Sequence, residues 1–164
     1  LFDQNQDMLK KNNIEVVVVL DNIRSMHNIG SIFRTCDAMG NCSIYLCGIC
    51  AIPPNKEIYK TALGASEVVK WQYFKTTEEA LVKLRNQKFE IIAIEQTSKS
   101  IALHKFSYSA QKIALIFGNE VKGISQKIIN LSDKSIEINQ YGVKKSMNVA
   151  VTTGIILWSI IHNN

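Results

Sequence analysis

Two glycines five residues apart follow a buried apolar stretch in the segment ALIFGNEVKGIS, residues 114–125. A phosphate-binding loop opens in this way, but its lysine and hydroxyl follow the second glycine, where they reach phosphates and magnesium. Here Lys122 precedes Gly123 and Ile124 follows it. The loop therefore lacks the chemistry of a triphosphate site. From Gly118 onward, glycine allows backbone conformations that expose N–H groups, and these groups could hold an adenosine instead.

Two more polar clusters follow apolar stretches. LDNIRSMHNIGSIFRTCDAMG covers residues 20–40, and INQYGVKKSMNVAVTTG covers residues 138–154. Like the glycine loop, each comes directly after a predicted strand, and the carboxyl ends of parallel strands share one edge of their sheet. We expect the three clusters to meet at that edge and form one site.

The elements that must position these clusters alternate along the chain. Strands are expected at 14–21, 42–49, 67–74, 90–96, 112–118 and 134–140. Several are unbroken β-branched runs, which is typical of strands covered on both faces. Helices are expected between them, ending at Gly40, ending at Gly64 and starting at Thr76 with Glu79 in capping-box spacing; an apolar helix over 147–161 closes the chain. This alternation predicts an α/β fold with a parallel sheet flanked by helices.

Composition narrows the class of protein. The 164 residues carry a net charge of +5, with 20% charged and 46% hydrophobic residues. This balance is typical of a soluble globular protein with an anionic partner, nucleic acid first. The longest apolar segment, 149–161, is interrupted by polar residues and is shorter than the roughly 20 residues that cross a bilayer. We see no secretory signal, and we expect one domain over 1–164, with 1–13 as a short N-terminal extension, in the cytoplasm and without a membrane.

The sequence places four cysteines within fifteen residues: Cys36, Cys42, Cys47 and Cys50. The C-x-x-C spacing of the last two is that of a redox pair or half a zinc site. A zinc site needs two more ligands in matching spacing, and His27 and His104 do not supply them. We therefore favour buried structural thiols in a reducing compartment, and expect no metal.

HNIGSIFRTCDAMG, ALIFGNEVKGIS and GVKKSMNVAVTTGI, in this order, resemble the three motifs of the SpoU (TrmH-type) branch of the SPOUT methyltransferases. The resemblance runs from the first strand to the last helix. It implies a Rossmann-like SPOUT fold with a C-terminal trefoil knot, and a homodimer. It also implies an enzyme that uses S-adenosylmethionine to methylate a ribose 2′-hydroxyl of tRNA or rRNA. The alternatives are a non-catalytic RNA-binding module with the same fold and an α/β enzyme for a small nucleotide.

The resemblance also assigns roles to individual residues. Arg34 is the main catalytic residue, Asn28 and Glu120 orient it or the substrate, and Ser146 and Asn148 shape the catalytic and cofactor pocket. The residues expected around the cofactor are Gly118, Asn119, Gly123, Ile138 and Met147, with Glu95 as a wall. The residues expected to contact RNA are His27, Arg34, Lys144 and Lys145, and the basic face of the dimer would add Lys10 and Lys11.

Arg34 is poorly suited to act as a general base, because a guanidinium stays protonated in proteins. We expect it to form a fork of hydrogen bonds to an RNA phosphate, which would then accept the proton of the hydroxyl.

Several of these residues also have purely structural interpretations. Asn28 could cap a helix that begins at Ile29, Ser146 could cap the last helix, and Glu120 could be the carboxylate at a helix start. We expect the aromatic side chains in the core rather than on the surface: Trp71, Tyr73 and Trp158.

The chain departs from the family pattern in two places. Asn139-Gln140 stands where Pro-Met is usual, and Val121 stands where glycine is common. Cofactor affinity and loop geometry are the properties that these changes would affect.

Overall fold

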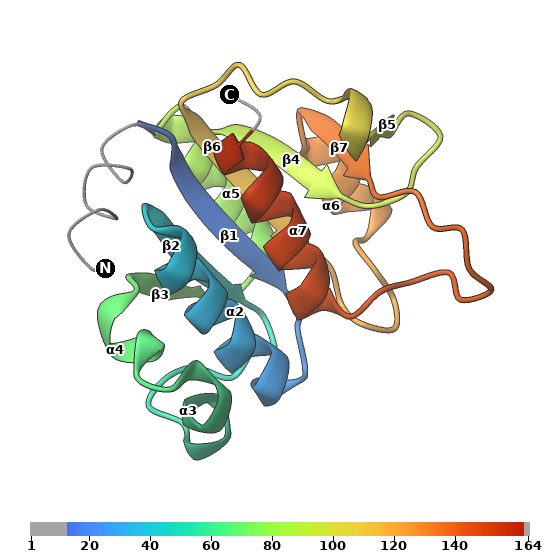
Figure 1. Ribbon diagram of the computed structural model, residues 1–164. Helices are drawn as coiled ribbons and strands as arrows, with labels where there is room; N and C mark the ends of the chain where they lie inside the picture. Colours follow the sequence, from blue (N-terminus) through green and yellow to red (C-terminus); the bar gives the residue numbers. More distant parts are fainter. Residues whose placement is uncertain (1–12, 163–164) are drawn as a thin grey trace.

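A single parallel sheet organises the part of the chain that the computed structural model describes, residues 13–162 (Figure 1). Lys10, Lys11 and nearly all of the expected extension lie outside these residues. Seven strands pair in the order β3-β2-β1-β6-β4-β7-β5, and every pairing is parallel. Their bounds are β1 Glu15–Asp21, β2 Cys42–Cys47, β3 Trp71–Phe74, β4 Glu90–Ile94, β5 Ile101–Ala102, β6 Lys112–Phe117 and β7 Lys134–Glu137. The predicted parallel α/β fold is confirmed.

Helices cover both faces of the sheet. On one face lie α2 (Met26–Met39), α3 (Lys56–Ala62), α4 (Ala65–Val68) and α7 (Val149–His162). On the other lie α5 (Thr77–Asn86) and α6 (Gln126–Leu131). A separate 3₁₀ turn, η1, spans Leu103–Lys105. Val16 and Val18 of β1 join the first core cluster, whereas Val17 and Val19 join the second. Burial on both faces is why this strand is an unbroken apolar run.

The strand order places the site. The chain leaves β1 in one direction through β2 and β3, and fills the other side with β6, β4, β7 and β5. Ligands of open α/β sheets bind beyond the carboxyl ends of the strands, near such a reversal. The carboxyl ends of β6, β4 and β7 are adjacent there, next to the end of β1.

Only the second half of the strand expected over 67–74 forms a strand. Gly64 adopts φ +90°, and a single helical turn, α4, follows it before β3 begins at Trp71. Val69 is buried while Val68 is 67% exposed, so this valine pair packs as the end of a helical turn rather than as part of the sheet. The structure also has β5 and α6, which the sequence pattern did not reveal.

The alternative interpretations of Asn28 and Ser146 as helix caps are both wrong. The side chain of Ser25, not Asn28, caps α2 and accepts a hydrogen bond from the Asn28 N–H at 3.2 Å. The side chain of Asn148, not Ser146, holds the start of α7, where it accepts from the N–H groups of Ala150 (2.9 Å) and Val151 (3.3 Å). In each case another polar residue lies at the position from which its oxygen reaches the free N–H groups of the first turn.

Aromatic residues lie nearer the surface than expected. Tyr73 is 42% exposed and Trp158 is 54% exposed, and Trp71 is half-buried. Tyr73 belongs to β3, the edge strand of the sheet, and Trp158 lies on the outer side of α7. The expectation of a core position is therefore wrong for Tyr73 and Trp158.

The cysteines are free thiols, and Cys36, Cys47 and Cys50 are buried while Cys42 is partly buried. Burial raises the pKa of Cys50 to about 11, and burial likewise raises the pKa of Cys47. Because a thiolate is the reactive form, both thiols of the C-x-x-C pair are held in their inert form. The predicted burial is confirmed for three of the four thiols.

Candidate active site

A cleft of about 1250 Å³ opens at the carboxyl edge of the sheet, and all three polar clusters contribute to its lining. The predicted residues in the lining are Asn28, Glu95, Gly118, Asn119, Glu120, Gly123, Ile138, Lys144, Lys145, Ser146, Met147 and Asn148. They come from the start of α2, the ends of β4, β6 and β7, and the segment before α7. The predicted convergence of the clusters is therefore confirmed, while the roles of individual residues stay predictions.

Arg34 and His27 are the two predicted site residues that do not line this cleft. Arg34 is exposed on α2, nearly two turns beyond Asn28. His27 points toward α3, where its Nε2 lies 3.0 Å from a carboxylate oxygen of Glu57. Within one chain, the guanidinium of Arg34 is thus not part of the cleft lining.

A hydrogen bond joins the first and third clusters. The amide nitrogen of Asn148 donates to the amide oxygen of Asn28 at 3.1 Å, across 120 positions of sequence. Since the oxygen of Asn148 also holds the start of α7, this one side chain aligns the beginnings of two helices. Asn28 and Asn148 both face the cleft.

Glu120 joins the second cluster to the first. Its carboxylate accepts hydrogen bonds from the backbone N–H groups of Arg24 (3.2 Å) and Ser25 (3.1 Å), just ahead of α2. Burial raises the pKa of Glu120, but hydrogen bonds from its own backbone, from the backbone of Ser25 and Arg24 and from the Asn28 side chain outweigh it, so the pKa is lowered overall. The expected helix-start role holds with a correction: the helix is α2, far away in sequence, and not one that begins at Glu120.

Asn119 and Asn22 fix the two loops against each other. Asn119 donates from its amide nitrogen to the carbonyl of Asn22 at 2.8 Å, and its oxygen accepts from Val121 and Lys122 N–H groups at 3.0 Å. Asn22, with φ 55°, accepts from the N–H of Ile49 at 3.1 Å. Asn22 is not among the residues predicted from the motifs, although asparagine directly after a strand is a common signal for a left-handed turn residue.

The glycine loop folds back on itself. A Cβ at Gly118 would overlap the backbone of Gly123 and Ile124, and Gly123 adopts φ +66°. The N–H of Gly123 donates to the carbonyl of Asn119 at 2.8 Å, and Glu95 accepts from the N–H of Ile124 at 3.0 Å. The close approach at Gly118 and the positive φ at Gly123 each require glycine.

Val121, which replaces a glycine of the family pattern, costs no backbone strain. It is 84% exposed, and it is absent from the residues with positive φ in the described part of the chain. Asn139 and Gln140 do line the cleft, so the other departure lies where it can affect a ligand.

The cleft combines apolar walls with polar groups. Ile94, Ile136, Ile138 and Met147 line it together with the polar side chains and the turns of the glycine loop. Ligand sites of small molecules occupy about 300–1,000 Å³, so this cleft has room for an adenosine-sized ligand and for part of a second one.

Among residues 13–162, no group of three or more His, Cys, Asp or Glu residues is placed to hold a metal ion. No helix in that range has the length and apolar character needed to cross a membrane.

Comparison with known proteins identifies relatives along nearly the whole chain. The pattern of the SpoU rRNA Methylase family matches residues 15–158. The tRNA (guanosine(18)-2'-O)-methyltransferase of Aquifex aeolicus is 33% identical over 156 residues, which cover 93% of this chain and 72% of that protein. Two solved structures have the same fold. The AdoMet-bound rRNA methyltransferase from Sinorhizobium meliloti has a TM-score of 0.83 at 26% identity, with 93% of this chain and 59% of that chain covered. The Aquifex aeolicus TrmH/SpoU tRNA modifying enzyme has a TM-score of 0.81 at 29% identity, with coverages of 98% and 81%.

Glu120→Gln tests the hydrogen bonds that hold the start of α2. Because the pKa of Glu120 is lower in the folded protein than its ordinary value of 4.5, the ionised carboxylate stabilises the fold above that pH. This contribution is lost as the pH falls through the lower folded value. We expect Glu120→Gln to lower the free energy of unfolding at pH 7 by up to about 1 kcal/mol, a small effect because the carboxylate is partly solvated.

Urea unfolding between pH 7 and pH 3 measures this difference, which should shrink below the ordinary glutamate pKa. Glu79→Gln, an exposed carboxylate on α5, is the matched control and should show no such trend. A Glu120→Gln deficit that stays constant across the pH range would contradict the proposed role of the charge.

Proposed function

The chain belongs to the SpoU rRNA Methylase family, and we propose that it transfers the methyl group of S-adenosylmethionine to a ribose 2′-hydroxyl of tRNA or rRNA. The observation that carries this proposal is the cleft, in which all three motifs meet around the pair Asn28 and Asn148. A non-catalytic RNA-binding module is not favoured, because the relatives are named as methyltransferases. A small-nucleotide enzyme is not favoured either, since the glycine loop lacks the triphosphate chemistry.

The cleft fits S-adenosylmethionine in its chemistry. The tight turns at Gly118 and Gly123 bring backbone to the surface of the cleft, and Ile138 and Met147 offer apolar contacts to an adenosine. Glu95 is held by its bond to Ile124 and closes one wall. When bound, the cofactor supplies a methyl group that its sulfonium has already activated.

The protein therefore has to position the ribose and help a proton leave. Asn28 and Asn148 are hydrogen-bonded to each other at the starts of α2 and α7, where they can orient the ribose. Lys144 and Lys145 are exposed on the rim and can pair with RNA phosphates. We assign proton removal to a phosphate next to the target ribose, held by a guanidinium fork from Arg34.

Because Arg34 does not line the cleft of its own chain, we propose a homodimer in which the partner chain presents it. Three large apolar side chains on the outer side of α7 are exposed: Val151 (55%), Ile155 (37%) and Trp158 (54%). Helix α2, which carries Arg34, packs beside α7, where Thr35 approaches Gly154 (Figure 1). An apolar stripe next to a charged side chain is typical of an interface between subunits.

The remaining family features are proposals of the same kind. We propose a C-terminal trefoil knot, which would place the segment before α7 against the loop after β6; their shared lining of the cleft supports this. The free thiols and the proposed RNA substrate both suit a cytoplasmic protein.

Isothermal titration tests the cofactor. We expect S-adenosylmethionine to bind with one site per chain, and ATP and NAD to give no heat, because the glycine loop lacks the lysine and hydroxyl of a triphosphate site and the chain has no G-x-G-x-x-G motif for a dinucleotide pyrophosphate. Mass spectrometry of the protein before titration is the control for cofactor that is already bound. Cofactor-free protein that gives no heat with S-adenosylmethionine would contradict the proposal.

Mixed dimers test whether Arg34 acts across the interface. We expect Arg34→Ala, and even Arg34→Lys, to lower methyl transfer on the order of 100-fold, because lysine cannot form the bidentate fork. Ser146→Ala impairs the cleft instead. If the cleft of one chain uses the arginine of its partner, a dimer that contains one chain of each variant has one intact site.

Co-refolding Arg34→Ala with Ser146→Ala in equal amounts should then restore about a quarter of wild-type activity, since half of the dimers are mixed and each has one intact site of two. Each variant alone, refolded in the same way, is the control. If Arg34 serves the cleft of its own chain, every site in the mixture is defective and no activity returns, which would sink the shared site.

A further inference from the structure

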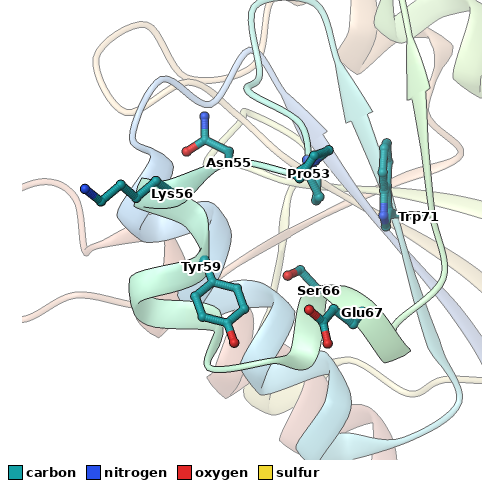
Figure 2. Close-up of a pocket in the computed structure, with 8 residues that line it drawn as sticks. Pro53, Asn55, Lys56, Tyr59, Ser66, Glu67 and Trp71 are labelled. Atoms are coloured by element: carbon teal, nitrogen blue, oxygen red, sulfur yellow. The ribbon is translucent and has the colours of Figure 1, made fainter.

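A second cavity, of about 460 Å³, lies between the loop after β2, the helices α3 and α4, and the start of β3. Figure 2 shows the rings of Pro53 and Trp71 beside each other, with the hydroxyl of Ser66 and the carboxylate of Glu67 on α4 below them. Tyr59 borders the cavity from α3. Its size falls within the range of about 300–1,000 Å³ of ligand sites, and none of its lining belongs to the cleft.

The walls of this cavity suit a flat aromatic ligand. Trp71 packs against the first core cluster on one side, so its ring is held in place while its remaining surface lines the cavity. Tyr59 is 54% exposed and adds a second aromatic surface at the rim. Aromatic side chains of this kind provide stacking platforms for unpaired nucleobases.

Glu67 supplies the polar group that would select the base. Its carboxylate is exposed and has no ion pair or hydrogen bond within residues 13–162. The neighbouring Glu57 differs, because Lys60 and His27 already engage it. A carboxylate binds best to two adjacent N–H donors, and among the RNA bases guanine offers such a pair, its N1–H and N2–H₂ groups.

Lys56 supplies a charge for the backbone of the same nucleotide. It extends outward from the first turn of α3 in Figure 2, and its ammonium group makes no ion pair in the described range 13–162. A free lysine beside the cavity, on the side away from Trp71, can contact a phosphate while the base lies inside.

Contacts between the start of α2 and α3 connect the cleft to the cavity. Asn28 lines the cleft, and the preceding residue, His27, contacts Glu57 at 3.0 Å. Thr61 of α3 also donates to the carbonyl of His27 at 2.9 Å, and Lys56 directly precedes Glu57. An RNA strand in the cleft can therefore continue over the start of α3 to the cavity.

We propose that this cavity binds an unpaired guanine of the RNA substrate, separate from the nucleotide that is methylated. Trp71 stacks on the base, Glu67 accepts its two N–H donors and Lys56 pairs with its phosphate. The inference rests on the proposed function for the identity of the partner as RNA, but the binding of the base can be measured without methyl transfer.

The test uses the indole N–H resonances of ¹⁵N-labelled protein, with guanosine 5′-monophosphate as the probe. The chain has two tryptophans, so Trp71→Phe assigns the resonance of Trp71, and Trp158 serves as the internal reference. We expect guanosine 5′-monophosphate to shift the Trp71 resonance with a dissociation constant at least five-fold lower than those of the adenosine, cytidine and uridine monophosphates. Glu67→Gln should remove this preference, whereas Glu79→Gln, an exposed carboxylate on α5, should keep it.

Titration of Glu67→Gln with S-adenosylmethionine separates this inference from the proposed function. Because Glu67 does not line the cleft, cofactor affinity should stay within two-fold of wild type, while affinity for bulk tRNA should fall about three- to ten-fold. A Trp71 resonance that no nucleotide shifts would overturn the inference and would indicate instead a surface that binds a protein partner. The methyltransferase proposal would not be affected by this result. Equal shifts with all four nucleotides, unaffected by Glu67→Gln, would overturn the assignment of guanine.

Discussion

The hydrogen bonds among Glu120, Asn28 and Asn148 are the constraint on which the site depends. Glu120 holds the backbone just before α2, and Asn28, in the first turn of that helix, is bound to Asn148 at the start of α7. Three loops that are distant in sequence are thereby fixed against one another at the carboxyl edge of the sheet. Without these bonds, the sheet would still bury its core, but the walls of the cleft would have no common alignment.

The same bonds explain what the sequence could predict and what it could not. Unbroken runs such as residues 15–21 indicate strands buried on both faces, and the motifs indicate which loops carry polar residues. The target of the Glu120 carboxylate lies 95 positions away, at Ser25, and no local pattern reveals such a pairing. Tyr73 and Trp158 were misplaced for a related reason: whether an aromatic residue is exposed depends on the edge position of β3 and on the outer side of α7.

If Arg34 acts in the cleft of a partner chain, as we propose, assembly is part of the chemistry. The cleft holds the amides, the glycine turns and the two lysines of the rim, but Arg34, whose guanidinium we propose to hold the proton-accepting phosphate, does not line it. Recognition of RNA can be divided in the same way. The cleft would hold the reacting ribose, while a second cavity, beside α3 and α4, would read a base elsewhere along the strand. Such a division provides specificity on a chain whose described residues carry little beyond the sheet and its helices.

A map of 2′-O-methylation in total RNA, read from resistance to alkaline hydrolysis, tests the central claim most directly. Cells that express the chain should protect one or a few ribose positions in tRNA or rRNA, and cells without it should lose protection at those positions alone. Reintroducing the wild-type chain, but not Arg34→Ala, should restore it. Identical protection maps with and without the chain, or a methyl group found on a base instead of a ribose, would contradict the account.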